Sequence, residues 1–290
     1  MNTVRQRLAA AVALTVTATG ASVAVAAPAH AVPNMTFHTS MSVSDSAAGK
    51  LQTVRCPAGR RILGGGGFVG GGGREVHIDH MRPVTTPAGD SFEVIASEVT
   101  HPGGIGYPGS WYLLAYAICG TAPAGLEYVS ASSAPSLASS HTVTVSCPAG
   151  KRVIGAAGQV EAAFGFVMLD EVTPSASLTS VRVTGFESET PSPIRWRVTA
   201  TAVCAHPIPG LSLVSALTPA DSLDKSVDVT CPAGTRIHST GWDLVGAVGQ
   251  GMVVAIFPGQ PLTTAHLRAR EDLTGLATTW QARVFAICAT

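Results

Sequence analysis

Hydrophobic and polar residues alternate along most of the chain, and this period of two predicts β-strands. The stretch 195–205, RWRVTATAVCA, places one set of side chains on a single strand face: Trp196, Val198, Ala200, Ala202 and Cys204. Other runs of this kind precede it at 126–133, 142–147, 151–160, 166–172 and 180–188. Pro, Gly and Ser residues separate the runs, and none shows a long helical period. The pattern predicts an all-β protein.

The sequence contains three copies of this pattern. Related segments that begin with a V-x-C-P-A-G motif occupy 54–69, 145–160 and 229–244, and segments of the form W-x7-C occupy 111–119, 196–204 and 280–288. The short joints TAPAG (121–125) and HPIPG (206–210) separate the copies. The sequence therefore predicts three β repeats, at 32–122, 123–207 and 208–290. They could close around a pseudo-threefold axis, like a β-prism, or form three small β-sandwiches in a row; the short joints and apolar surfaces favour close association.

The six cysteines fall two to a repeat, and they lie on the same strand faces as the tryptophans and alternate valines. Both cysteines of a repeat should therefore point into one core. This parity predicts three pairs: Cys56–Cys119, Cys147–Cys204 and Cys231–Cys288. A bond from Cys119 to Cys147, which would join two repeats, is the rival scheme.

Residues 1–31 have the pattern of a secretory signal peptide. Arg5 and Arg7 precede an uncharged stretch from Leu8 to Ala29, and a small-residue site ends at Ala31. A membrane anchor is the alternative, but Thr, Ser and Gly dilute the stretch and it ends in A-x-A. Together with the cysteines, this segment predicts a disulfide-bonded protein free in the extracellular space.

The balance of charge excludes some partners. Without Arg5 and Arg7 the 18 basic residues become 16, against 18 acidic residues. We therefore expect no electrostatic capture of nucleic acid or of an anionic membrane. We also expect no cofactor, because the glycine-rich stretch 61–76, RILGGGGFVGGGGREV, lacks the Lys-Ser or Lys-Thr and the helix that a phosphate loop needs. Its simplest interpretation is a strand and a turn.

Few residues suggest chemistry. His77 and Asp79 share a strand face in VHIDHM and could offer two metal ligands, although a solvated strand face is the simpler interpretation and we predict no metal site. The triplet Gly89-Asp90-Ser91 resembles the GDS of some serine hydrolases, but chance explains it better. A hydrolase using His77, Asp79 or Ser91 is the least favoured function, and we predict that the protein is not an enzyme.

Aromatic residues are candidate contacts for sugars. The parity of Trp111, Trp196 and Trp280 assigns them to the core beside the cysteines. Tyr107 and Trp242 each belong to one copy and lie in Gly-rich regions, where an exposed ring would be a contact. An arginine recurs at 61, 152 and 236, as a structural hydrogen-bond donor or as part of a threefold anion site.

The C-P-A-G-x-R segment paired with W-x7-C resembles repeats of secreted actinobacterial proteins, most of which have no assigned activity. The resemblance covers nearly the whole chain after residue 31. It implies export, disulfides and an all-β repeat, and it transfers no catalytic or binding residue.

A repeat whose common residues are Cys, Pro, Gly and Trp supplies a scaffold, and the copies differ in their loops. The sequence therefore favours a secreted, non-catalytic, lectin-like protein that binds a cell-surface or extracellular polysaccharide, with Tyr107, Trp242, His77 and Asp79 as candidate contacts. A structural or protein-binding role, as a coat component, toxin-like factor or inhibitor, is the alternative.

Overall fold

The computed structural model describes residues 32–101 and 106–290, and the predicted signal peptide lies outside this part of the chain. Repeat 1 forms six strands: β1 (Thr36–Met41), β2 (Gly49–Arg55), β3 (Arg61–Gly70), β4 (Val76–Thr86), β5 (Gly89–Glu98) and β6 (Tyr112–Gly120). Repeat 2 forms β7 (Glu127–Ser132), β8 (Ser140–Ser146), β9 (Arg152–Glu161), β10 (Val167–Pro174), β11 (Ser180–Glu187) and β12 (Arg197–Ala205). Repeat 3 forms β13 (Ser212–Leu217), β14 (Lys225–Thr230), β15 (Arg236–Val245), β16 (Gly251–Pro258), β17 (Thr264–Glu271) and β18 (Gln281–Ala289).

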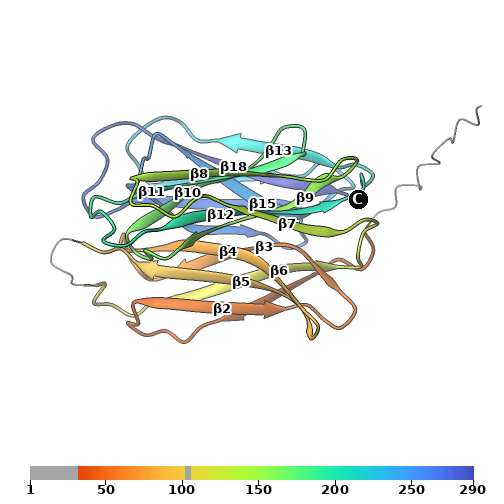
Figure 1. The fold of residues 1–290 in the computed structure, drawn as a ribbon, viewed down its shortest axis with the longest axis horizontal. Helices are drawn as coiled ribbons and strands as arrows, with labels where there is room; N and C mark the ends of the chain where they lie inside the picture. The colour runs from red at the N-terminus through yellow and green to blue at the C-terminus, as the bar shows by residue number, and fades with distance from the viewer. Residues whose placement is uncertain (1–31, 102–105) are drawn as a thin grey trace, which may run out of the picture.

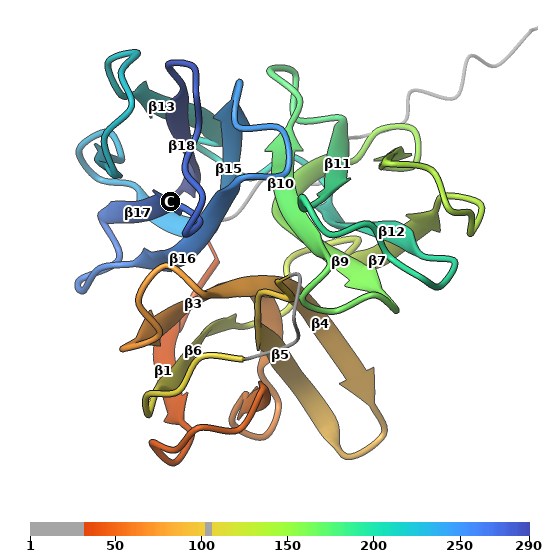
Figure 2. The ribbon, with the colours of Figure 1, turned by 90° about the vertical axis from the view of Figure 1, so that its left-hand side faces the viewer.

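The strands are shared between repeats. Sheet A has the order β1-β6-β3-β16-β17-β14, sheet B the order β2-β5-β4-β9-β12-β7, and sheet C the order β13-β18-β15-β10-β11-β8. Each sheet thus takes the first, third and sixth strands of one repeat and the second, fourth and fifth strands of another. The exchange closes a ring, and Figure 2 shows three lobes around a common centre. The fold is all-β and pseudo-threefold, as the sequence predicted.

Each repeat is itself a small sandwich, because its two groups of three strands face one another within a lobe (Figure 1). The alternative of three sandwiches in a row was right about the two layers and wrong about the arrangement. Hydrogen bonds join β3 to β16, β4 to β9 and β10 to β15, so the sheets run without interruption from lobe to lobe.

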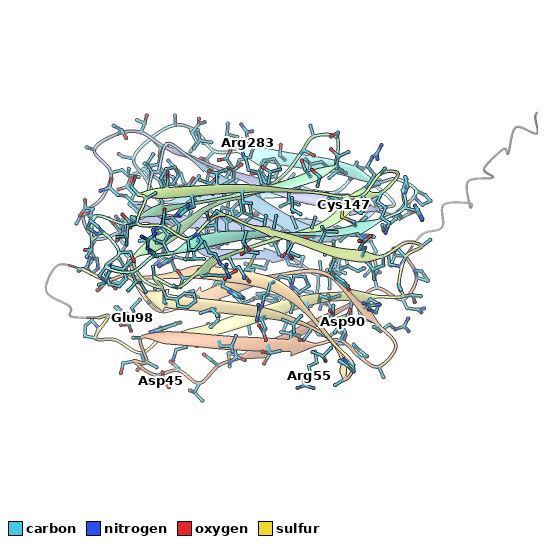
Figure 3. All side chains as sticks on the ribbon, viewed as in Figure 1. Asp45, Arg55, Asp90, Glu98, Cys147 and Arg283 are labelled. Carbon is cyan, nitrogen blue, oxygen red and sulfur yellow. A yellow bond between two sulfur atoms is a disulfide. The ribbon has the colours of Figure 1, made fainter. Side chains whose placement is uncertain are left out.

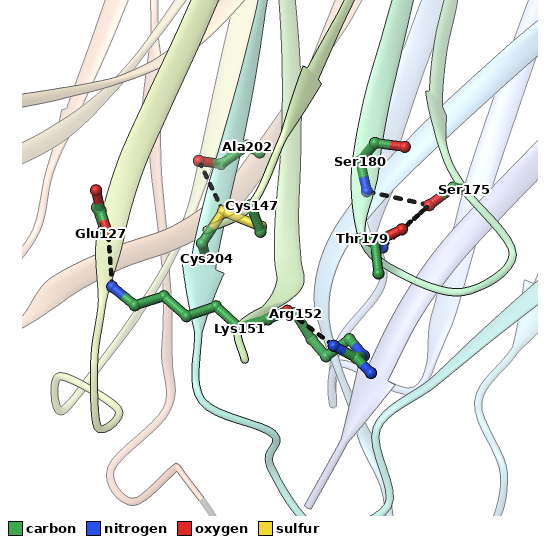
Figure 4. Close-up of a disulfide and its surroundings, with 9 residues drawn as sticks. All are labelled: Glu127, Cys147, Lys151, Arg152, Ser175, Thr179, Ser180, Ala202 and Cys204. Atoms are coloured by element: carbon green, nitrogen blue, oxygen red, sulfur yellow. Dashed lines mark hydrogen bonds and ion pairs between the residues drawn. A yellow bond between two sulfur atoms is a disulfide. The ribbon is translucent and has the colours of Figure 1, made fainter. Parts of the chain in front are cut away.

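The predicted disulfides are confirmed. The bonds join Cys56 to Cys119, Cys147 to Cys204 and Cys231 to Cys288, each within one repeat. Figure 4 shows the bond of repeat 2, between the end of β8 and β12. Three disulfides are typical of extracellular proteins. Among the residues described, no helix has the length and apolar character needed to cross a membrane.

The tryptophans that close the repeats are also buried as predicted. Trp111, Trp196 and Trp280 are at most 1% exposed. Their indole N–H groups donate to Glu98, Glu187 and Glu271 at 3.1, 3.2 and 2.8 Å. Glu98 lies near one end of the molecule and Cys147 near the other (Figure 3). Each lobe therefore has a buried indole–carboxylate pair toward one end and a disulfide toward the other.

The glycine run forms strand β3 and the turn after it. A Cβ on Gly66 would lie 2.1 Å from the carbonyl oxygen of Ile256 in the neighbouring repeat, which leaves no room for a side chain. The turn residues Gly71, Gly72 and Gly73 have φ of 82°, 71° and 56°, which glycine adopts without strain. The run thus serves close packing between repeats and a tight turn.

Candidate functional site

The outer faces of the three sheets can be compared position by position, because corresponding strands meet at the middle of each. There the third strand of one repeat pairs with the fourth strand of another. The pairs there are Phe68 with Ala255 in sheet A, Gln159 with His80 in sheet B, and Asp243 with Glu171 in sheet C. The repeats share one backbone plan, and these positions show how far their surface chemistry differs.

The outer face of sheet A carries aromatic rings. The ring of Tyr116 stacks on that of Phe257 with centroids 5.2 Å apart, and it contacts Phe37 at 5.4 Å. His266 extends the row, 5.0 Å from Phe257. These rings fill the face mainly by packing against one another.

The outer face of sheet B carries hydroxyl groups and ion pairs. Ser130 and Thr201 form a hydrogen bond of 2.7 Å across the strands, as do Ser132 and Thr199. Arg82 pairs with Glu93 at 3.0 Å. These groups therefore have partners within the protein, whereas both ring nitrogens of His80 and Gln159 Oε1 have none in the described part of the chain.

The outer face of sheet C contains two hollows. The larger, of about 570 Å³, is lined by Thr144, Thr173, Pro174, Ser175, Ala176, Ser180, Arg182, Leu213, Ser215, Arg283 and Phe285. The smaller, of about 310 Å³, is lined by Thr142, Asp170, Glu171, Arg182, Thr184, Phe186, Asp243, Leu244, Val245, Gly246 and Val248. Both include Arg182, so they meet there, and the Ser175–Ser180 turn at the rim of the larger hollow is visible in Figure 4.

Charged groups lie at the meeting point of the two hollows. Arg182 pairs with Glu171 at 2.6 Å, and the Thr184 hydroxyl donates to the same carboxylate at 2.9 Å. Asp243 faces Arg283 across β15 and β18. Burial, and then the negative charge of Glu171, raise the pKa of Asp243 above its ordinary value. This face can therefore offer carboxylate, guanidinium and hydroxyl groups to a polar ligand.

Two further hollows lie at the end of repeat 1, around Asp90. The carboxylate of Asp90 accepts hydrogen bonds from Arg61 at 2.7 Å, the Ile62 amide at 3.1 Å and the Tyr128 hydroxyl at 2.8 Å. These contacts make Asp90 a structural anchor. Arg152 instead donates to the Lys151 carbonyl, so the recurring arginines do not share one role.

The expectation of an exposed ring at Trp242 is wrong. Trp242 has no exposed surface, and its indole N–H donates to the Leu169 carbonyl at 3.2 Å. Trp242 holds the place in β15 that Gly67 and Gly158 hold in β3 and β9, and its ring fills the core there. The ring is therefore not available to a ligand at the surface.

His77 and Asp79 are also buried, at 1% and 0% exposed, so their strand face is not solvated. His77 Nδ1 lies 3.1 Å from Asp79 Oδ1, and the Ser97 hydroxyl donates to Asp79. Burial lowers the pKa of His77 to about 4. Within 32–101 and 106–290, no group of three or more His, Cys, Asp or Glu side chains is arranged to hold a metal ion.

Tyr107 and Ser91 lie apart from these residues. Tyr107 is half-buried, and its amide donates to Glu98 at 3.0 Å. Ser91 pairs with Val84, whereas His77 pairs with Ser97, six residues along β5 and thus about 20 Å away. The structure does not bring Ser91 together with His77 and Asp79.

Sequence reasoning missed the charged face of sheet C. A signal was present: Asp243 and Arg283 replace Phe68 and Leu114 at matching places in the repeats, and both lie on the face opposite the core. Comparing the repeats on that face would have identified them. Comparison of the chain with protein-family models and with curated proteins finds no match.

Proposed function

We propose that the protein is a secreted, non-catalytic binding protein that recognises an extracellular or cell-surface polysaccharide on the outer face of sheet C. The observation that carries this proposal is the pair of hollows that meet at Arg182. A site that extends over two hollows suits a chain of sugar units better than a single small molecule.

The chemistry of the lining supports a sugar ligand. Sugars present many hydroxyl groups, which carboxylates accept from and guanidinium groups donate to. Apolar patches of sugar rings pack on apolar side chains, and the partly exposed Leu213 supplies such surface in the larger hollow. Phe285 lies beneath Arg283 there and is only 6% exposed. Export rests on the predicted signal peptide and agrees with the three disulfides.

The test is retention of the oxidised protein, residues 32–290, on insoluble polysaccharides and whole cell walls, with and without competing sugars. Arg283→Ala removes a guanidinium from the larger hollow, and Ser215→Leu narrows it. Both variants should lose retention and stay folded. Arg268→Ala, which removes an exposed arginine of β17 in sheet A, is the matched control and should be retained like the wild type.

A protein-binding role is the second candidate. Phe68, Phe257 and Tyr112 are partly exposed on sheet A, and aromatic residues are enriched at protein interfaces. Two results together would favour this role. The wild type would show no retention on polysaccharides, and Phe68→Ser would lose binding of a partner protein that the wild type binds. Sedimentation of the pure protein shows whether the partner is a second copy.

A further inference from the structure

Asp79 and Asp170 occupy the same unusual place in their repeats. Each is the extra residue of a β-bulge, Asp79 between Ile78 and His80, and Asp170 between Leu169 and Glu171. Repeat 3 has Val254 there. The bulge itself therefore does not require a carboxylate.

The two aspartates differ in their partners. Asp79 Oδ2 accepts a hydrogen bond from the Ser97 hydroxyl, and Asp79 Oδ1 lies 3.1 Å from Nδ1 of His77 without a hydrogen bond. The places of Ser97 and His77 are taken in repeat 2 by Phe186 and Met168, which offer neither group. Asp170 is only 6% exposed, and its Oδ1 has no hydrogen-bond partner. A buried carboxyl oxygen without a partner destabilises a fold, so packing does not explain Asp170.

The smaller hollow has one carboxyl group more than the nearby cations can pair with. Its lining includes Asp170, Glu171 and Asp243, and Arg182 is the one cationic side chain among the lining residues. Arg182 is paired with Glu171. Arg283 lies opposite Asp243. Burial and the charges of Asp243 and Glu171 raise the pKa of Asp170 well above its ordinary value, as expected where no cation compensates it.

A cation of suitable size would relieve this imbalance. The side chains are not arranged to hold a metal ion in the described part of the chain. An organic ammonium group is a better match, because it donates up to three hydrogen bonds without requiring a fixed coordination geometry. The larger hollow next to it can hold the sugar units attached to such a group.

We propose that the smaller hollow of sheet C binds a primary ammonium group beside Asp170, so that the polysaccharide recognised is one with free amino groups. This inference rests on the proposed polysaccharide binding and names the class of sugar. The positive amine lies between the carboxylates of Asp170 and Asp243, and the neighbouring units extend past Arg182 into the larger hollow.

Calorimetric titration tests this with three soluble oligomers of equal length: glucosamine, N-acetylglucosamine and glucose. Wild-type protein, residues 32–290 with disulfides intact, should bind the glucosamine oligomer at least tenfold more tightly than the acetylated one. Asp170→Asn should lose that preference. Asp228→Asn, which removes an exposed carboxylate from sheet A, is the control and should keep it.

The outcomes separate this inference from the proposed function. Equal binding of all three oligomers would overturn the amine preference and leave polysaccharide binding standing. No binding of these oligomers, together with no retention on any polysaccharide, would overturn both. Preference for the amine that survives Asp170→Asn would also overturn the inference. If Asp170→Asn folds poorly, Asp170→Val supplies the residue that repeat 3 carries at this bulge.

Discussion

Sheets A and C have one strand plan and opposite surface chemistry. Phe68 in β3 faces Leu114 in β6, and the same two places in sheet C hold Asp243 and Arg283. On sheet A the rings fill the surface by contacting one another, as Tyr116 and Phe257 do. On sheet C the charged groups line hollows. The residues of the core therefore preserve the strand arrangement in each repeat, and the side chains of the outer faces are free to differ in what they bind.

The largest effect is expected where two repeats touch. Gly66 in sheet A and Gly241 in sheet C hold the same place, and a Cβ there would lie 2.1 Å from the Ile256 oxygen or 2.4 Å from the Val172 oxygen. Gly66→Val or Gly241→Val should cost more than about 4 kcal/mol of unfolding free energy, or prevent folding, because a backbone cannot yield as a side chain can. Denaturant unfolding measures this.

Sheet B supplies the control for this prediction, because its matching position is Ala157, which already carries a Cβ. Ala157→Gly should cost only about 1 kcal/mol. Equal losses at all three positions would show that the junctions are not distinguished by how closely the backbones approach.

The next largest effect is expected from removing a disulfide, a feature that all three repeats share. Replacing Cys147 and Cys204 by serine opens a loop with a sequence separation of 57 residues. The chain-entropy model gives a loss of about 4 kcal/mol. Cys231 and Cys288 have the same separation, so their removal should cost a similar amount. Thermal unfolding of the two double variants checks this, and losses differing several-fold would mean that the lobes unfold separately.

The disulfides and the buried tryptophans, which the repeats share, could be predicted from the sequence. Counting by twos from Cys204 places Trp196 inside, and the structure confirms this because β12 runs regularly between them. The sharing of strands between repeats could not be predicted in the same way. Alternation shows which face of a strand is buried and does not show which strand it pairs with.

Predicting burial from the alternation of side chains failed where a strand contains a bulge or is buried on both faces. Asp79 is the extra residue of a bulge, so it is buried with His77 on what looked like a solvated face. Trp242 lies in the central strand β15, where both faces are covered along much of the length, so Gly-rich surroundings did not mean exposure. The charged face of sheet C combines residues from repeats 2 and 3, and only the strand exchange brings them together.

The two bulge aspartates should respond to mutation with opposite signs. Asp170→Val removes a buried carboxyl group whose Oδ1 has no hydrogen-bond partner, and it should stabilise the protein by about 1–2 kcal/mol near pH 7. Asp79→Val removes the acceptor of the Ser97 hydroxyl and should destabilise it by about 1–3 kcal/mol. Chemical denaturation of both variants beside the wild type makes the comparison, and destabilisation by Asp170→Val would show that Asp170 serves the fold.

The effect at Asp170 should also depend on pH. Its pKa is raised well above 3.8 in the native state, so the native state keeps a proton that the unfolded state releases. The stability from this group is complete below about pH 3.8 and falls as the pH rises through the native pKa. The advantage of Asp170→Val should therefore grow with pH over that range. A pH-independent difference would mean that the pKa of Asp170 is the same in the native and unfolded states.

The smallest effects compare one carboxylate on each outer face. Glu171 on sheet C is 7% exposed and is bonded to Arg182 and Thr184, so Glu171→Gln should cost about 1–2 kcal/mol. Asp228 on sheet A is 53% exposed and pairs with His266, so Asp228→Asn should cost less than about 0.5 kcal/mol. Added salt should reduce the cost at Asp228 further and leave that at Glu171 nearly unchanged, because burial limits screening. Thermal unfolding at low and high ionic strength distinguishes the two. Equal costs would show that the carboxylates of sheet C are no more engaged than surface charges, and the contrast between the two faces would then lie in shape alone.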